Sequence, residues 1–274
     1  MKKTLILAAA ILMICQSASA YKEKDLMVRS ESMNKDIPVT IVTPDGYRKG
    51  KAFPVIYMLH GHSGNNRMWT SDEMAGILAD MYGIIMVLPD GGFDSWYFDS
   101  PMTPEYKYET FVAKELIEYV DTNYKTIRDR SARAITGLSM GGHGALYLAF
   151  RHQDIFGSAG STSGGVDFRP FPENWGLATR LGTYAEHPEN WEKNTVINMT
   201  HLVKPGALNI IVDCGTEDFF YEVNCAFHDK LMKEGIPHDF YVRPGVHWWN
   251  YWKNAIQYQV LYFSNCFKAA ANQE

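Results

Sequence analysis

Short apolar runs alternate along this chain with longer stretches that carry apolar residues at helical spacing. The continuous runs predict buried strands at 53–59, 84–88, 132–138, 208–212 and 240–242. The helical patterns lie between and after these runs, at 70–81, 104–124, 141–150, 221–234 and 251–267. Apolar strands that alternate with helices are typical of an α/β fold, in which helices cover both faces of a mostly parallel sheet.

This fold class predicts where a functional site lies. Ligands of such sheets bind at the carboxyl ends of the strands, so candidate residues are sought just after a predicted strand. The segment 166–204 fits the alternation worst, and it contains Pro170, Pro172, Trp175 and Trp191. We expect this segment to form loops and short helices over the site.

The first 20 residues have the features of a secretory signal peptide. A basic start precedes an unbroken apolar run over 5–15, and the small residues of 18–20 suit cleavage. The run is shorter than the roughly 20 apolar residues of a membrane span. We therefore expect a bacterial chain that is exported to the periplasm or beyond, with one domain over 21–274. A lipoprotein anchored at Cys15 is the alternative, which the bulky Ile14 disfavours.

Composition and charge narrow the classes of partner. The chain is 46% hydrophobic and 21% charged, an ordinary globular composition. It holds 26 Lys and Arg against 31 Asp and Glu, a formal net charge of -5, and no basic block occurs. Nucleic acid is not an expected partner, because its binding requires a basic patch. Cys214 and Cys225 are close enough in sequence to pair in an oxidising compartment, but we favour buried free thiols for them and for Cys266.

The strongest chemical motif is GLSMG at 137–141, which fits the pattern G-x-S-x-G. An apolar strand leads into the motif and a helix rich in small residues leads out of it, as a nucleophile elbow requires. Ser139 is therefore predicted to project at the carboxyl edge of the sheet as a nucleophile. A helix-capping serine in a tight turn is the alternative. A phosphate loop or a dinucleotide fingerprint is rejected, because the Lys-Ser/Thr ending and the third glycine are missing.

A serine hydroxyl is a weak nucleophile that needs a base. In the nucleophile-elbow arrangement the chain order is Ser, then Asp or Glu, then His. His247 follows the last predicted strand and alone satisfies both this order and the sheet edge. The strand that ends at 212 leads to three acids. Asp213 continues the strand and is expected to be structural, Asp218 has room to orient His247, and Glu217 is the runner-up.

Acyl transfer also needs N–H donors for the developing oxyanion. The backbone N–H groups of Met140, after the nucleophile, and of His62, in the loop after an early strand, are the expected donors. His60 and His62 form an H-x-H pair, but the downstream Asp and His ligands of a metallohydrolase are missing. We therefore expect neither a metal nor another cofactor.

The chain resembles the putative-esterase (esterase D-like) family of α/β-hydrolases. The resemblance covers nearly the whole chain after Pro38, through MLHGHSG, LPDGGFDSWYFDSP, YETFVAKELIEYVD, TGLSMGGHGAL, DCGTEDFFYEVN and RPGVHWWNYW. This family includes feruloyl and acetyl-xylan esterases of carbohydrate esterase family 1, S-formylglutathione hydrolases and mycolyl-transferring antigens. It implies the α/β-hydrolase fold, one domain, and Ser139, Asp218 and His247 as the catalytic triad. The chain departs from its relatives at His62, where they often carry Gly or Leu.

These observations predict a secreted serine esterase that acts on feruloyl or acetyl esters of plant polysaccharide. Trp96, Tyr97 and Trp248 are the candidate substrate contacts, with core packing as the alternative for Trp96 and Tyr97. Glu109 is expected to be structural. Three other functions stay open: acyl transfer to a sugar or lipid acceptor, general short-chain acyl ester hydrolysis, and glycan binding by a catalytically inactive homologue.

Overall fold

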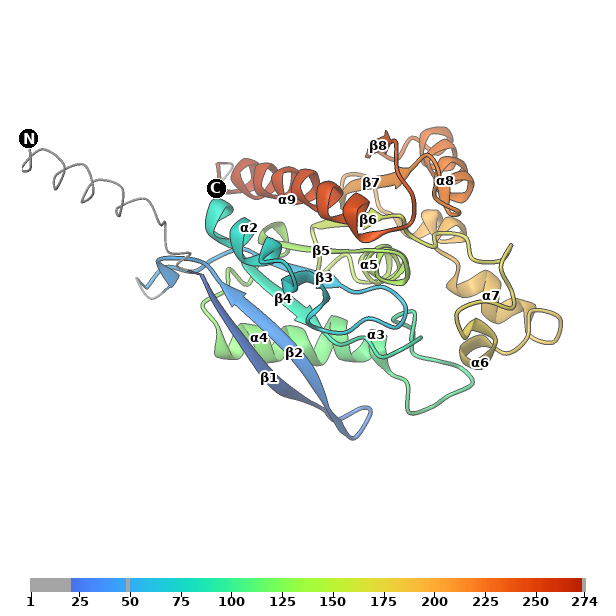
Figure 1. Ribbon diagram of the computed structural model, residues 1–274, viewed down its shortest axis with the longest axis horizontal. Helices are drawn as coiled ribbons and strands as arrows, with labels where there is room; N and C mark the ends of the chain where they lie inside the picture. Colours follow the sequence, from blue (N-terminus) through green and yellow to red (C-terminus); the bar gives the residue numbers. More distant parts are fainter. Residues whose placement is uncertain (1–20, 48–49, 273–274) are drawn as a thin grey trace, which may run out of the picture.

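A sheet of 8 strands forms the centre of the computed structural model, which describes residues 21–47 and 50–272 (Figure 1). The predicted signal peptide lies outside the described residues. The strand order is β1-β2-β4-β3-β5-β6-β7-β8; β1 and β2 are antiparallel to their neighbours, and the other strands are parallel. The strands are β1 (Lys22–Ser30), β2 (Lys35–Thr43), β3 (Val55–Leu59), β4 (Ile85–Pro89), β5 (Arg133–Gly137), β6 (Ser158–Thr162), β7 (Asn209–Gly215) and β8 (Asp239–Arg243).

Helices cover both faces of this sheet (Figure 1). One face packs against α2 and α9, and the other against α4, α5 and α8. In β3, Tyr57 joins the core on one face while Ile56 and Met58 join the core on the other. Burial on both faces explains why the parallel strands read as continuous apolar runs. The helices are α2 (Met74–Tyr82), α3 (Tyr108–Thr110), α4 (Leu116–Asn123), α5 (Met140–Arg151), α6 (Leu177–Leu181), α7 (Pro188–Asn194), α8 (Tyr221–Lys233) and α9 (Trp249–Ala271), with a π-helical turn at Phe111–Glu115.

The predicted α/β architecture is confirmed, and the sequence patterns missed β1, β2 and β6. Strands β1 and β2 form a hairpin at one edge of the sheet, and β1 carries mostly charged, exposed residues rather than an apolar run. Strand β6 is buried throughout, yet its sequence is SAGST, which carries no hydrophobic signal. Its small residues are needed because α9 passes close by: a Cβ on Gly160 would lie 2.3 Å from Gln259 Oε1.

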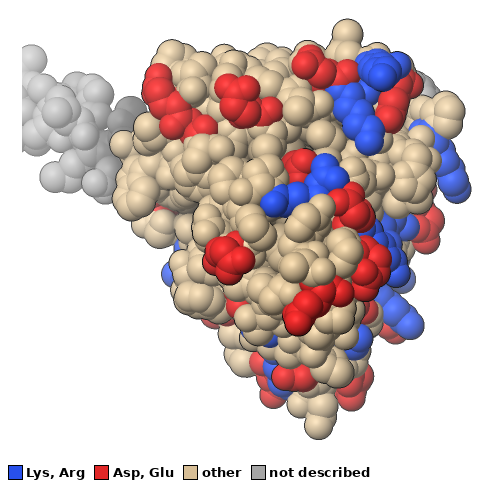
Figure 2. All heavy atoms as spheres, turned by 90° about the vertical axis from the view of Figure 1, so that its right-hand side faces the viewer, with Lys and Arg blue, Asp and Glu red and all other residues tan. Residues whose placement is uncertain are grey.

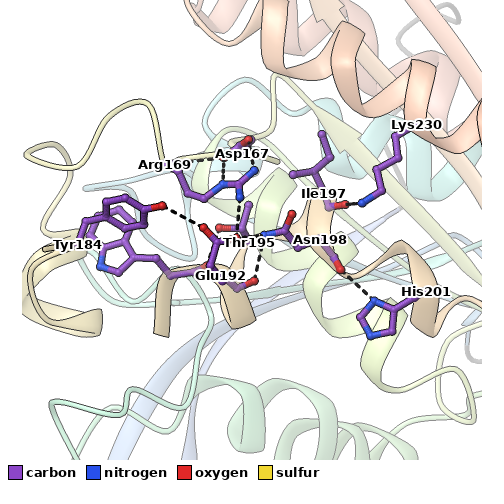
Figure 3. Close-up of polar contacts among 10 residues, drawn as sticks. Asp167, Arg169, Tyr184, Glu192, Thr195, Ile197, Asn198, His201 and Lys230 are labelled. Atoms are coloured by element: carbon purple, nitrogen blue, oxygen red, sulfur yellow. Dashed lines mark hydrogen bonds and ion pairs between the residues drawn. The ribbon is translucent and has the colours of Figure 1, made fainter. Parts of the chain in front are cut away.

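The segment 166–204 consists of loops and short helices, as predicted. Figure 3 shows how polar contacts hold part of it, with the Arg169 guanidinium between the carboxylates of Asp167 (2.8 Å) and Glu192 (2.6 Å). The segment also contacts α8, because the Lys230 ammonium of that helix donates to the Ile197 carbonyl at 2.7 Å. On the face that carries α6 and α7, acidic and basic side chains lie interspersed among uncharged ones (Figure 2).

Two further observations concern the chain outside the site. Cys214 is a buried free thiol, whereas Cys225 and Cys266 are free thiols that are only partly buried. Among the helices of residues 21–47 and 50–272, none is both long enough and apolar enough to cross a membrane.

Candidate active site

Ser139 occupies the turn between β5 and α5 in a backbone conformation that is unusual for a residue with a side chain. Its φ is 55° and its ψ is -116°. Such a conformation costs on the order of 1–3 kcal/mol and persists only where its surroundings enforce it. Here the Ser139 N–H donates to the Thr162 carbonyl at 3.0 Å, and the Ser139 carbonyl accepts from the His143 N–H at 3.1 Å. The turn therefore presents the hydroxyl at the carboxyl end of β5.

The glycines around Ser139 are required because backbones meet there. A Cβ on Gly137 would lie 2.5 Å from the Gly141 carbonyl group. A Cβ on Gly141 would lie 2.5 Å from the Leu59 carbonyl oxygen at the end of β3. Neither backbone can move aside without opening the sheet or the first turn of α5. The spacing of the motif is thus set by sterics at the strand-to-helix turn.

His247 joins Ser139 to Asp218. Its Nε2 lies 2.9 Å from Ser139 Oγ, and its Nδ1 lies 2.9 and 2.8 Å from the two Asp218 carboxylate oxygens. The Asp218 carboxylate is buried and also accepts from the Phe220 N–H at 2.8 Å. Since an ionised carboxylate only accepts, Nδ1 carries the ring proton and Nε2 is left to accept from the serine hydroxyl.

Aromatic side chains enclose the His247 ring. Phe219 lies 4.2 Å away between ring centroids, Trp252 lies 4.9 Å away edge-on, and Phe220 lies 5.6 Å away. Only 14% of the His247 side chain is exposed. Trp175, from the segment 166–204, stacks on Phe219 with 5.6 Å between the ring centroids. These contacts fix the plane of the imidazole and limit the access of water to it.

Glu217 and Asp213, the two other candidate acids of the sequence analysis, contact groups other than His247. Glu217 is exposed, and its carboxylate accepts from the Gly245 N–H at 3.1 Å. Asp213 is buried in β7, where it accepts from the Thr162 hydroxyl and, at 2.6 Å, from the Gln259 amide. Burial raises the pKa of Asp213 to about 6. Of the three predicted acids, Asp218 is the one that the structure brings to His247.

The loop after β3 packs directly against the nucleophile. A Cβ on Gly61 would lie 2.6 Å from Leu138 Cδ1 and 3.4 Å from Ser139 Cβ. In the part of the chain that the structure describes, neither the Met140 N–H nor the His62 N–H donates to a protein acceptor. Met140 is the first residue of α5, where unpaired N–H groups favour negative charge. Burial lowers the pKa of the His62 imidazole, which packs 4.7 Å from the Phe93 ring.

Within residues 21–47 and 50–272, no three or more His, Cys, Asp and Glu side chains gather into a group that could hold a metal ion. The His60 ring of the H-x-H pair bonds to backbone groups on both of its nitrogens.

The prediction that Trp96 and Tyr97 contact substrate is wrong for this structure. Their exposed fractions are 1% and 0%. Both residues have positive φ values, 53° and 61°, which turn the chain so that the rings enter the core. Trp96 packs 5.4 Å from the His143 ring, and the Tyr97 hydroxyl donates to the His60 carbonyl at 3.1 Å. Core packing, the alternative, is what the structure contains.

Trp248 differs, because 65% of it is exposed beside His247. It lines an apolar recess with Met68, Ser71, Trp249 and Trp252. The sequence patterns did not single out two other exposed aromatic residues, which with Trp248 we call the aromatic rim: Phe219 (49% exposed), whose ring lies 4.2 Å from that of His247, and Phe93 (62%), whose ring lies 4.7 Å from that of His62. Their positions in the sequence could have identified them, because Phe219 directly follows Asp218 and Phe93 lies in the loop after β4.

Glu109 contacts side chains of the α5 region rather than the triad, which agrees with the structural role expected for it. Its carboxylate accepts from the Tyr147 hydroxyl at 2.9 Å and pairs with Arg151 at 2.7 Å and His152 at 2.8 Å. Burial raises the pKa of Glu109, but the hydrogen bonds from His152, Arg151 and Tyr147 outweigh it and hold the pKa at about 2.

Comparison with known proteins identifies the family of this chain. Residues 30–263 match the family described as "Putative esterase". The chain is 29% identical over 240 residues to Esterase Rv1288 of Mycobacterium tuberculosis, a match of 76% of this chain and 52% of that protein. It is 29% identical over 276 residues to the diacylglycerol acyltransferase/mycolyltransferase Ag85B of Mycolicibacterium smegmatis, covering 86% and 82% of the two chains.

A solved structure of a ferulic acid esterase superposes with a TM-score of 0.79 at 28% identity, over 90% of this chain and 98% of that one. The chain spans about half the length of the first curated relatives that it matches. The match of the family over most of the chain and the shared architecture lead to one conclusion: this chain belongs to the "Putative esterase" family and has the α/β-hydrolase fold.

Proposed function

We propose that this chain is a serine carboxylic-ester hydrolase with Ser139 as nucleophile, His247 as base and Asp218 as the acid that orients the base. One observation carries the proposal. The His247 ring lies 2.9 Å from Ser139 Oγ through one nitrogen and 2.8 Å from Asp218 through the other. In this arrangement the imidazole can take the proton of the strained serine, while the buried carboxylate orients the ring and stays ionised.

In the first half of the reaction, Ser139 Oγ attacks the ester carbonyl carbon while His247 Nε2 takes the hydroxyl proton. The carbonyl oxygen becomes an oxyanion, which the N–H groups of Met140 and His62 stabilise. Each such donor is worth about 2.7–4 kcal/mol to the transition state. Asp218 stabilises the imidazolium without taking its proton. The tetrahedral intermediate then expels the alcohol, which leaves with the proton from His247.

The second half regenerates the enzyme. Water loses a proton to His247 Nε2 as its oxygen attacks the acyl carbon bound to Ser139. The new oxyanion occupies the same two N–H groups. When it collapses, the carboxylic acid leaves and the proton on His247 returns to Ser139 Oγ. These steps need only groups of this chain and water.

We further propose that the protein is exported and cleaves feruloyl or acetyl esters on plant polysaccharide. Two observations support this substrate class: the similarity to a ferulic acid esterase, and the exposed aromatic rim of Phe93, Phe219 and Trp248 around the triad. Aromatic rings at such a rim offer apolar faces to a sugar or a phenolic acid. The basic start and apolar run of residues 1–20 support export.

The substrate test measures the acids that chain 21–274 releases from acetylated, feruloylated arabinoxylan, with Ser139→Ala as the control. Release of ferulate by the active chain alone identifies a feruloyl esterase. Release of acetate alone identifies an acetyl-xylan esterase. If neither acid exceeds the control, the polysaccharide is not the substrate, and p-nitrophenyl acetate then tests for a general short-chain esterase. A chain that is inactive on both, and that a fluorophosphonate does not label, supports the alternative of a catalytically inactive glycan-binding homologue.

Acyl transfer is the second candidate function, because the chain is similar over most of its length to a mycolyltransferase. The same triad forms the acyl-enzyme in both cases, and the acceptor decides the outcome. Product analysis with added sugar or glycerol separates the two functions. Hydrolysis predicts free acid at all acceptor concentrations, whereas transfer predicts an acylated acceptor at the expense of the acid.

A further inference from the structure

We propose that His60 is a positioning residue, which holds the peptide between Gly61 and His62 so that its N–H faces the oxyanion. The inference rests on the proposed function and assigns a task to a side chain that lies outside the triad. His60 follows β3 directly and is 1% exposed. Both of its ring nitrogens bond to backbone groups, and these bonds lie on two different loops.

The partners of His60 determine which nitrogen carries its proton. The Gly91 N–H, in the loop after β4, lies 2.7 Å from His60 Nε2. A backbone N–H can only donate, so Nε2 is the unprotonated acceptor. The ring proton is therefore on Nδ1, which donates to the Gly61 carbonyl at 2.7 Å. The Nδ1–H tautomer of His60 thus satisfies both contacts at once, and the Asp90 carboxylate lies farther from Nε2, with its Oδ1 at 3.7 Å.

The Gly61 carbonyl is held from two directions. It accepts from His60 Nδ1 and also from the Gly64 N–H at 3.0 Å, which uses both of its lone pairs. The described chain contains no cis peptide bonds, so the N–H of this peptide, which belongs to His62, points opposite to its carbonyl. Among the described residues that N–H donates to no protein acceptor, and Gly61 itself packs against the nucleophile, with 3.4 Å between the serine Cβ and a Cβ built on Gly61.

Other contacts keep the frame of this loop independent of His60. The Ser63 N–H donates to the Phe93 carbonyl at 2.8 Å, and the Tyr97 hydroxyl donates to the His60 carbonyl at 3.1 Å. Loss of the His60 ring therefore leaves the loop attached, while the Gly61 peptide loses one of the two bonds that fix its rotation. A donor that is free to rotate stabilises the oxyanion less, because it must be oriented during the reaction.

Two variants separate the donor of His60 from its acceptor. In His60→Asn the side-chain amide N–H takes the place of Nδ1–H and can still donate to Gly61, but it cannot reach Gly91. In His60→Gln the amide oxygen takes the place of Nε2 and can still accept from Gly91, but the donor to Gly61 is lost. Both variants remove the ring and leave a buried amide, so each is the matched control of the other.

We expect His60→Gln to lower kcat on p-nitrophenyl acetate by up to about 10²-fold with little change in KM, since the loss falls on the transition state. His60→Asn should lower kcat clearly less than His60→Gln does, because it keeps the donor to the Gly61 carbonyl. A trifluoromethyl ketone, which forms an ionised hemiketal with a catalytic serine, should lose affinity for the Gln variant by a similar factor. Circular dichroism and thermal unfolding check that both variants are folded.

The inference is overturned if the Gln variant retains as much kcat as the Asn variant, because His60 then only ties two loops together. It is also overturned if nitrogen NMR of the wild-type ring shows the proton on Nε2. That spectrum requires no substrate, so it decides the inference even if the wild type hydrolyses no ester. A wild type without esterase activity contradicts the proposed function, whereas equal Gln and Asn variants of an active enzyme contradict the role of His60 alone.

Discussion

The substitution Asp218→Asn tests the triad assignment most selectively, because the structure determines how the new amide must sit. In the wild type, Asp218 Oδ1 accepts from the Phe220 N–H at 2.8 Å. An asparagine can satisfy that buried N–H only with its oxygen, which turns its NH2 group toward His247 Nδ1. A donor now lies 2.8 Å from Nδ1, in place of the nearer of the two carboxylate oxygens, and this favours the tautomer whose proton lies on Nε2 and points at Ser139 Oγ. The ring can then no longer accept the serine proton.

The expected loss is about 10⁴-fold in kcat, the effect of a wrong histidine tautomer in a serine triad. This corresponds to about 5 kcal/mol of activation free energy. KM should change little, because Asp218 is buried behind His247 and does not face the ester. The assay is steady-state hydrolysis of p-nitrophenyl acetate by wild type and variant, with active sites counted by a fluorophosphonate.

The control variant is Glu217→Gln. Glu217 directly precedes Asp218 and was the other candidate acid, but its carboxylate accepts from the Gly245 N–H. Gln keeps an oxygen for that bond, so we expect kcat close to the wild-type value. The reasoning fails if Asp218→Asn loses less than tenfold, or if the Glu217 variant loses as much as the Asp218 variant.

Three further substitutions test stability and substrate contact. Glu109→Gln should lower the free energy of unfolding by up to about 3 kcal/mol at pH 7. The folded pKa of Glu109 lies below its ordinary 4.5, at about 2, so urea titrations should show this difference shrinking as pH falls from 4.5 toward 2, and a constant difference would contradict it. Trp96→Ala should cost about 3–5 kcal/mol of stability, seen as a lower Tm, because the ring is buried. Trp248→Ala should change stability by no more than about 0.5 kcal/mol and raise KM for methyl ferulate; an unchanged KM would remove Trp248 from the substrate site.

The sequence was informative about the site because nucleophile-elbow chemistry is tied to the ends of strands. The order Ser139, Asp218, His247 and the edge rule selected three residues that lie far apart in the chain, and the structure brings their side chains within hydrogen-bonding distance. The Asp213 prediction followed from the same rule, since a residue that continues β7 is buried in the sheet.

The sequence was less informative where backbone geometry decides the result. Trp96 and Tyr97 follow a strand, as a substrate-binding residue would, but their positive φ values turn both rings into the core. Phe93, three residues earlier, remains 62% exposed. Hydrophobic pattern cannot distinguish these cases, because all three side chains are aromatic and the sign of φ depends on contacts with segments far along the chain.

The missed strand β6 has a related cause. Its segment, SAGST, is buried by its neighbours β5 and β7 and by the close passage of α9. Burial of small polar residues leaves no apolar run to detect. Sequence patterns therefore overlooked β6, which makes room for a helix, in addition to the hairpin strands β1 and β2.

The central claim, that Ser139 is the nucleophile activated by His247, is tested most directly by mapping a covalent adduct. The chain is treated with a fluorophosphonate, digested, and analysed by mass spectrometry. The account predicts one phosphonylated residue, Ser139, with labelling abolished in Ser139→Ala and slowed at least about 10³-fold in His247→Ala. Labelling of a different residue, or equal labelling rates in wild type and His247→Ala, would contradict it.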